Sequence, residues 1–130
     1  MSFKLQSLLE DFKNATSRLD DVLQQKKDEY IRDSAIQRFE FTFDISWKTV
    51  KAFLEEKKGV VCASPKDCFR EAYKQGLVEY DDFWITITDT RNKTVHTYNE
   101  AVAEEVYGFL PQALIYFKKL LEYLTVQSQN

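Results

Sequence analysis

The sequence has little of what β-sheets, metal centres and exported proteins require. Its 130 residues include three glycines, two prolines, two cysteines and one histidine. Tight turns use glycine and proline, so their scarcity favours long helices over a many-stranded sheet. Cys62 and Cys68 have no second cysteine pair and no histidine near them, so a zinc site would lack ligands. We expect neither a metal nor a cofactor.

Charge and hydrophobicity exclude further classes of protein. The net charge of −3 argues against broad nonspecific binding of nucleic acid. A hydrophobic fraction of 44% and a charged fraction of 30% are typical of a folded protein, and we expect one domain over residues 1–130. Charges interrupt the N-terminus, which resembles neither a signal peptide nor a membrane span, so a cytoplasmic location is expected. A disulfide between Cys62 and Cys68 is an alternative, but nothing else indicates secretion, and reduced thiols are expected.

Apolar residues at helical spacing predict two long helices in the first half of the chain. The first is expected over about 3–27. The second is expected over about 34–58, capped by Asp33 or Ser34. Two lysines followed by Gly59 are a common end of a helix, and they end this one.

The second half predicts a short helix and two longer ones. Ser64 and Pro65 are a strong helix start, and that helix ends near Gly76. A fourth helix is expected from about 80 to 95; its threonine-rich centre favours a strand locally, but a lone strand has nothing to pair with.

Asn99 is expected to cap a fifth helix over about 100–126, which Pro111 should kink or split. The predicted fold is therefore all-α, an up-and-down four-helix bundle with an additional short helix.

The second predicted helix is unusually aromatic and also carries two acids on one face. One apolar stripe is expected in the core, whereas a second stripe containing Phe41 and Ile45 exceeds what one bundle face needs and predicts contact with another copy of the chain. Glu40 and Asp44 stand four residues apart, where like charges repel. A cation such as Lys48 or Arg91 is therefore a plausible partner; ordinary surface carboxylates are the alternative.

The segment from Arg91 to Tyr98 combines a fixed cation, the only histidine and a phenol. On a regular helix Arg91 and His96 point about 140° apart, so they converge only where the helix loosens or ends, or where two copies meet. A lone histidine at a helix end is more often a cap or a surface group. The segment from Arg91 to Tyr98 therefore supports a functional role only when the rest of the sequence is considered with it.

Two sequence patterns together resemble the nucleotidyltransferase substrate-binding proteins, a branch of the HEPN superfamily. The first is Arg91-x4-His96-x-Tyr98, and the second is the stretch from Arg38 to Lys48 on the preceding long helix. The resemblance implies a helical bundle that forms a homodimer and pairs with a separate minimal nucleotidyltransferase in a two-component system of toxin–antitoxin type. A nucleotide or RNA is the ligand that it implies.

The resemblance also implies roles for individual residues. Some relatives are metal-independent RNase toxins, and by position Arg91 and His96 would be the catalytic pair. Asn92 would orient the substrate, with Glu40 and Asp44 as supporting residues. The partner of such toxins can add AMP to the motif tyrosine, which here is Tyr98. In this chemistry the imidazole moves a proton and the guanidinium stabilises the charged phosphate.

Three functions remain open on these grounds. The chain is a substrate-binding or modifiable subunit of a nucleotidyltransferase system, an RNase toxin that this partner neutralises, or a helical interaction module with a structural histidine. It has no glycine-rich phosphate loop, so it is not expected to be the nucleotidyltransferase itself.

Overall fold

The computed structural model describes residues 1–79 and 81–129, and this part of the chain is helical, without strands. The elements are α1 (Phe3–Leu23), α2 (Glu29–Phe53), the π-helical turn η1 (Leu54–Lys58), α3 (Pro65–Lys74), α4 (Asp81–Lys93), the 3₁₀ turn η2 (Thr94–His96) and α5 (Glu100–Ser128). The predicted all-α bundle with an additional short helix is confirmed. The threonine-rich centre of α4 is helical, as expected.

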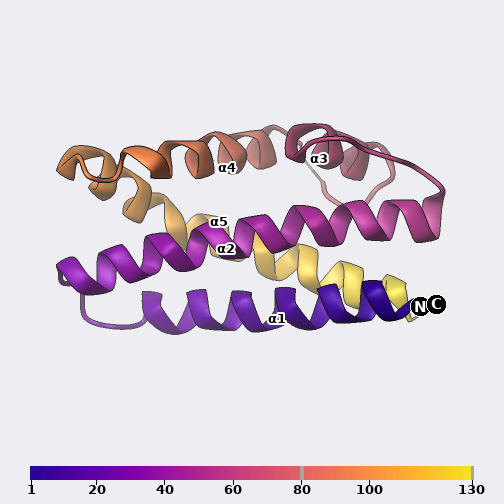
Figure 1. The fold of residues 1–130 in the computed structure, drawn as a ribbon, viewed down its shortest axis with the longest axis horizontal. Helices are drawn as coiled ribbons and strands as arrows, with labels where there is room; N and C mark the ends of the chain where they lie inside the picture. The colour runs from indigo at the N-terminus through magenta and orange to yellow at the C-terminus, as the bar shows by residue number, and fades with distance from the viewer. Residues whose placement is uncertain (80, 130) are drawn as a thin grey trace.

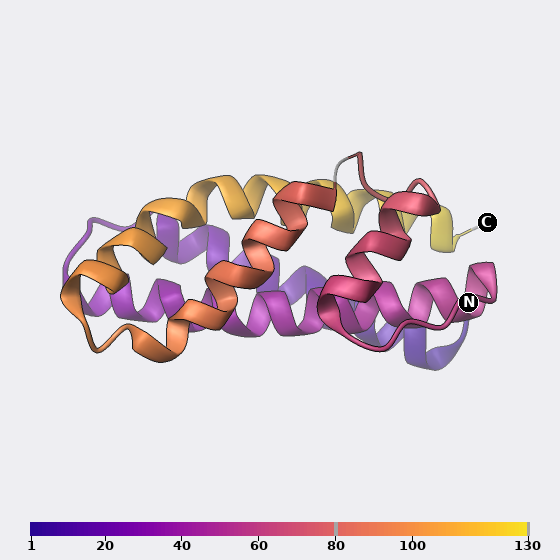
Figure 2. The same cartoon turned by 90° about the horizontal axis from the view of Figure 1, so that it is seen from above.

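The helices form three layers that run up and down the long axis (Figure 1). α1 lies on one side, α2 and α5 form the middle, and α3 followed by α4 covers the other side, with α4 crossing the middle layer obliquely (Figure 2). Both termini lie at one end of the bundle, and the turn from α4 into α5 lies at the opposite end. Among the described residues, no helix has the length and apolar character needed to cross a membrane.

A row of stacked aromatic rings joins four of the helices in the core. Phe69 on α3 lies between Phe43 on α2, at 5.9 Å between ring centroids, and Trp84 on α4, at 4.5 Å. Trp84 also contacts Phe117 on α5 edge to face at 5.7 Å. Aromatic pairs of this kind contribute about 0.5–1.5 kcal/mol each beyond the area that they bury. The row therefore fixes the start of α4 against the middle layer.

The second helix begins earlier than predicted. α2 starts at Glu29 rather than near residue 34, because Asp28 is the capping residue and accepts the Ile31 N–H at 2.7 Å. The extra turn carries Arg32, whose side chain is 6% exposed and binds Glu100 at the start of α5. This long-range ion pair is not visible in the local pattern that suggested Asp33 or Ser34 as the cap. α1 likewise ends at Leu23, short of residue 27.

Helix ends marked by Gly59, Ser64 and Asn99 agree with the sequence. Ser64 accepts the Asp67 N–H at 3.3 Å, and Asp67 returns the contact by accepting the Ala63 N–H at 2.9 Å. Asn99 caps α5 by accepting the N–H groups of the second and third residues that follow it. Gly59 ends η1 with φ of 65°, a conformation that glycine adopts without strain.

Pro111 does not split the fifth helix as one alternative predicted. α5 continues without interruption from Glu100 to Ser128. Pro111 is exposed, so water can solvate the carbonyl that proline leaves without its helical partner.

The expectation of reduced thiols is wrong for this structure, which contains a disulfide between Cys62 and Cys68. Cys62 lies on the connector after α2 and Cys68 in the first turn of α3, and both are buried. The capping contact from Ala63 to Asp67 folds the connector back, which leaves the two Cα atoms 5.1 Å apart.

We predict that reduction of this disulfide weakens the fold without abolishing it. The bond closes a short loop, and opening a loop of this size removes about 2 kcal/mol of stability in the chain-entropy estimate. Thermal unfolding with and without a reductant measures the effect, and the double variant Cys62→Ala/Cys68→Ala is the control that should not respond to the reductant. A wild-type melting temperature that is insensitive to reduction would contradict the prediction.

Candidate functional site

The predicted motif lies where α4 ends, at the end of the bundle opposite to the chain termini (Figures 1 and 2). α4 stops at Lys93, and η2 follows for one turn. The chain then leaves helical geometry at Asn99, which is extended, before α5 begins. The regular spacing that would separate Arg91 and His96 by about 140° is therefore interrupted between the two residues.

Arg91 is held by two acids of α2. Its Nε and Nη2 atoms donate to the two carboxylate oxygens of Asp44, each at 3.2 Å. Its Nη1 atom lies 3.4 Å from Glu40 Oε2. A guanidinium fork that meets a carboxylate through two bonds is geometrically specific as well as attractive.

This arrangement confirms that Arg91 is the cation that neutralises Glu40 and Asp44. Lys48, the other candidate, is exposed. The Arg91 side chain is 24% exposed and those of Glu40 and Asp44 are 35% and 43% exposed, so water screens the attraction only in part. The pairing relieves the repulsion between two acids four residues apart, and it fixes the end of α4 to the middle of α2.

Thr94 supports the arginine and was not among the predicted site residues. Its hydroxyl accepts from Arg91 Nη1 at 2.9 Å and donates to the Arg91 carbonyl at 2.7 Å. Thr94 is 5% exposed, so these bonds are largely shielded from water. A threonine three residues after an arginine at a helix end is the signal that was available in the sequence.

His96 faces Tyr98. The Tyr98 hydroxyl lies 3.5 Å from His96 Nδ1, and the two rings are nearly perpendicular, at 77° with 6.0 Å between centroids. Tyr98 is 85% exposed, which confirms the expectation that its hydroxyl is presented to solvent, and His96 is exposed too. Asn92 lies on the same exposed end of α4.

The motif residues thus form two groups, each held by its own side-chain contacts. Arg91 is occupied by Asp44 and Glu40, and the ring of His96 is engaged with Tyr98. A phosphate that reached Arg91 would compete with Asp44 for the same donors, because a guanidinium recognises both groups with the same fork. Within the described residues, no group of three or more histidine, cysteine, aspartate or glutamate side chains is placed to hold a metal ion.

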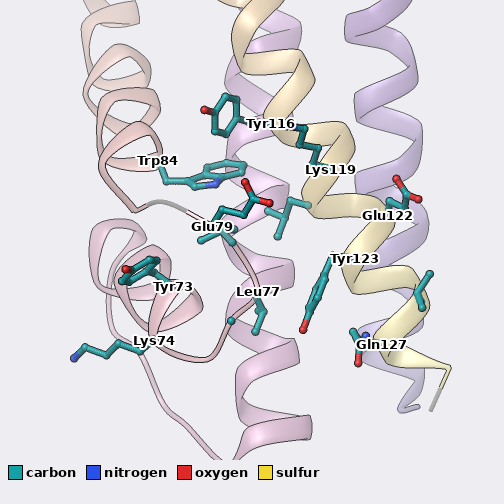
Figure 3. Close-up of a pocket in the computed structure, with 14 residues that line it drawn as sticks. Tyr73, Lys74, Leu77, Glu79, Trp84, Tyr116, Lys119, Glu122, Tyr123 and Gln127 are labelled. Carbon is teal, nitrogen blue, oxygen red and sulfur yellow. The ribbon is translucent and has the colours of Figure 1, made fainter.

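A concave feature lies near the chain termini, away from the motif (Figure 3). It is an open groove of about 1040 Å³ between the α3–α4 connection and the last turns of α5. Tyr73, Trp84 and Tyr123 are among its lining residues, and Glu79 and Lys119 extend into it. None of the predicted site residues lines this groove.

Known proteins resemble this chain in both sequence and fold. Residues 7–126 match the family described as nucleotidyltransferase substrate binding protein like. The chain belongs to this family. The probable ribonuclease HepT of Haemophilus influenzae is 35% identical over an alignment of 99 residues, and the match covers 73% of this chain and 68% of that protein.

Solved structures show that this family member shares its bundle with other proteins. A crystal structure of a Thermus thermophilus protein has a TM-score of 0.83 and 36% identity, covering 87% of this chain and 98% of the other. A tri-AMPylated HEPN toxin of Shewanella oneidensis, in complex with MNT antitoxin, has a TM-score of 0.77 and covers 97% of this chain and 99% of the other. The toxin is 18% identical, so this likeness concerns the fold.

We predict that Arg91 and Asp44 are energetically coupled. A double-mutant cycle with Arg91→Gln and Asp44→Asn should give an interaction of about 1 kcal/mol in chemical unfolding, which is at the upper end for partly exposed pairs because the contact is bidentate. The control is the exposed single contact between Lys66 and Asp89, at 2.7 Å, for which less than about 0.5 kcal/mol is expected. Equal couplings in the two cycles would contradict a special role for the fork.

Proposed function

We propose that this chain is the substrate-binding partner subunit of a two-component minimal nucleotidyltransferase system of toxin–antitoxin type. The match of residues 7–126 to the substrate-binding family carries this proposal. A minimal nucleotidyltransferase is the proposed partner, and the cytoplasm, where nucleotides and RNA are available, is the proposed location. The whole described bundle forms one such subunit.

The exposed tip of the bundle supports the proposal. Tyr98 stands outside the helices, and its hydroxyl is accessible to the active site of another protein. The Shewanella toxin with the same fold carries AMP groups and binds an MNT antitoxin. We infer that Tyr98 is the residue that the partner modifies here.

Adenylylation of the chain is directly measurable. Incubation with the cognate nucleotidyltransferase, ATP and Mg²⁺ should add one or more AMP groups, seen by intact mass, because the Tyr98 hydroxyl is the exposed nucleophile of the motif. Tyr98→Phe should prevent the addition, whereas Tyr30→Phe, which removes the hydroxyl of a similarly exposed tyrosine at the start of α2, should not. An active partner that leaves the wild-type mass unchanged would contradict modification and leave a binding role.

Ribonuclease activity is the second candidate function, and the likeness to the probable ribonuclease HepT favours it. In this role His96 would exchange a proton with a ribose hydroxyl or with the leaving oxygen. Arg91 would stabilise the charged phosphate once its guanidinium breaks part of its contact with Asp44. Asn92 would orient the substrate.

An RNA cleavage assay on the isolated chain separates the two functions. Cleavage that His96→Ala abolishes while the melting temperature stays unchanged would identify a ribonuclease, since the exposed imidazole contributes little to the fold. Intact RNA after incubation with folded wild type would leave the chain as a binding and modification subunit.

We further propose that the chain forms a homodimer through the second apolar stripe of α2. Phe41 and Ile45 are only partly buried in the single chain, and Arg18 of α1 lies over the Phe41 ring, 5.0 Å from its centroid. The second apolar stripe therefore borders α1 at Phe41.

Substitution of Phe41 tests the homodimer. Phe41→Asp should convert a dimer into a monomer in sedimentation experiments, because the interface would bury a charge. Arg18 can pair with the new carboxylate in the single chain, so the fold should be retained. Tyr73→Asp, at an exposed site on α3, is the control that should leave the dimer intact. A wild-type monomer at tens of micromolar would rule out this interface.

A further inference from the structure

We propose that His96 is the base that activates Tyr98 when the partner enzyme adds AMP to it. This inference rests on the proposed function, since it presupposes that Tyr98 is the acceptor. It assigns a group of this chain, rather than of the partner, to the removal of the phenolic proton. The observation that carries it is the 3.5 Å contact between Tyr98 Oη and His96 Nδ1.

The backbone brings these two side chains together. Residues two apart on a regular helix do not face each other, but the helix ends here. Thr97 closes the turn, with its N–H and its hydroxyl both donating to the Thr94 carbonyl, at 3.3 and 2.9 Å. The Asn99 N–H then donates to the His96 carbonyl at 3.0 Å. These bonds form a tight turn in which the Tyr98 ring returns to the edge of the imidazole.

In the tautomer that carries its proton on Nε2, the contact has the polarity that proton transfer requires. A phenol is protonated near neutral pH and is a weak nucleophile in that form, whereas an imidazole can accept a proton there. With its proton on Nε2, His96 presents the free Nδ1 lone pair to the Tyr98 hydroxyl. Both side chains are exposed, so a nucleotide held by the partner can approach the oxygen without rearrangement of the bundle.

The transfer step balances with these groups and a nucleoside triphosphate. As the bond from Tyr98 Oη to the α-phosphorus of ATP forms, the bond from that phosphorus to the β-phosphate oxygen breaks and pyrophosphate leaves. The phenolic proton passes to His96 Nδ1 and then to solvent. The partner supplies the triphosphate and its metal, and this chain supplies both the nucleophile and the base.

The test compares the rate of AMP addition for wild type, His96→Ala and His96→Asn, with the cognate partner in every case. An asparagine amide oxygen can accept the Tyr98 hydrogen bond near the position of Nδ1, but it cannot take the proton. Both variants should lose roughly 100-fold or more in the maximal rate, the lower range for general base catalysis, with little change in the protein concentration at half-maximal rate. If His96→Asn reacted at the wild-type rate, His96 would serve only to orient Tyr98, and the proposal would be overturned.

Chemical rescue separates a missing base from a damaged binding surface. Because the site is exposed, millimolar imidazole should restore part of the rate to His96→Ala, and it should have no effect on Tyr98→Phe. Val95→Ala, a neighbouring exposed residue of η2, is the matched control and should react at the wild-type rate. No rescue, or equal losses in Val95→Ala and His96→Ala, would overturn the proposal. A wild-type chain that gains no AMP would instead refute the proposed function on which this inference rests.

Discussion

The guanidinium fork of Arg91 on Asp44 is the contact on which the geometry of the candidate site depends. The stacked aromatic rings fix the start of α4, but they lie near its first turns and cannot determine where the helix ends. Arg91 provides that second attachment, because two parallel bonds to one carboxylate restrict rotation as well as distance. The turn that carries His96 and Tyr98 begins three residues later, so its position follows from this ion pair.

A second fork holds the other side of the same turn. Arg32 of α2 donates to both carboxylate oxygens of Glu100, at 2.6 and 3.0 Å, just after the exposed segment ends. These hydrogen bonds lower the pKa of the Glu100 carboxyl and raise that of the Arg32 guanidinium. The segment between Arg91 and Glu100 is thus anchored to α2 at both ends. Acids of α2 hold its first residue, and an arginine of α2 holds its last. Such anchoring allows exposed reactive side chains to keep a defined arrangement without being buried.

The sequence predicted most helices because their signals are local. Ser64 with Pro65 and Asn99 are capping residues whose bonds reach only two or three residues along the chain. The start of α2 was missed because its extra turn is stabilised by Arg32 and Glu100, which are 68 residues apart. The disulfide was kept only as an alternative, because the absence of any other sign of secretion outweighed the short separation of Cys62 and Cys68.

In the candidate site, too, some contacts follow from local sequence signals and others do not. The pairing of Arg91 with Glu40 and Asp44 was one of the alternatives open from the sequence, because a cation relieves the repulsion between two acids on one helical face. The contact between His96 and Tyr98 was not, because it depends on a 3₁₀ turn that ends a regular helix. This contact also constrains any chemistry at the tip. An imidazole that faces the Tyr98 hydroxyl cannot accept a ribose proton through the same nitrogen, and a phosphodiester on that hydroxyl would lie against the same ring edge. Nucleophile activation and RNA cleavage through Nδ1 would therefore compete for one nitrogen of the His96 ring.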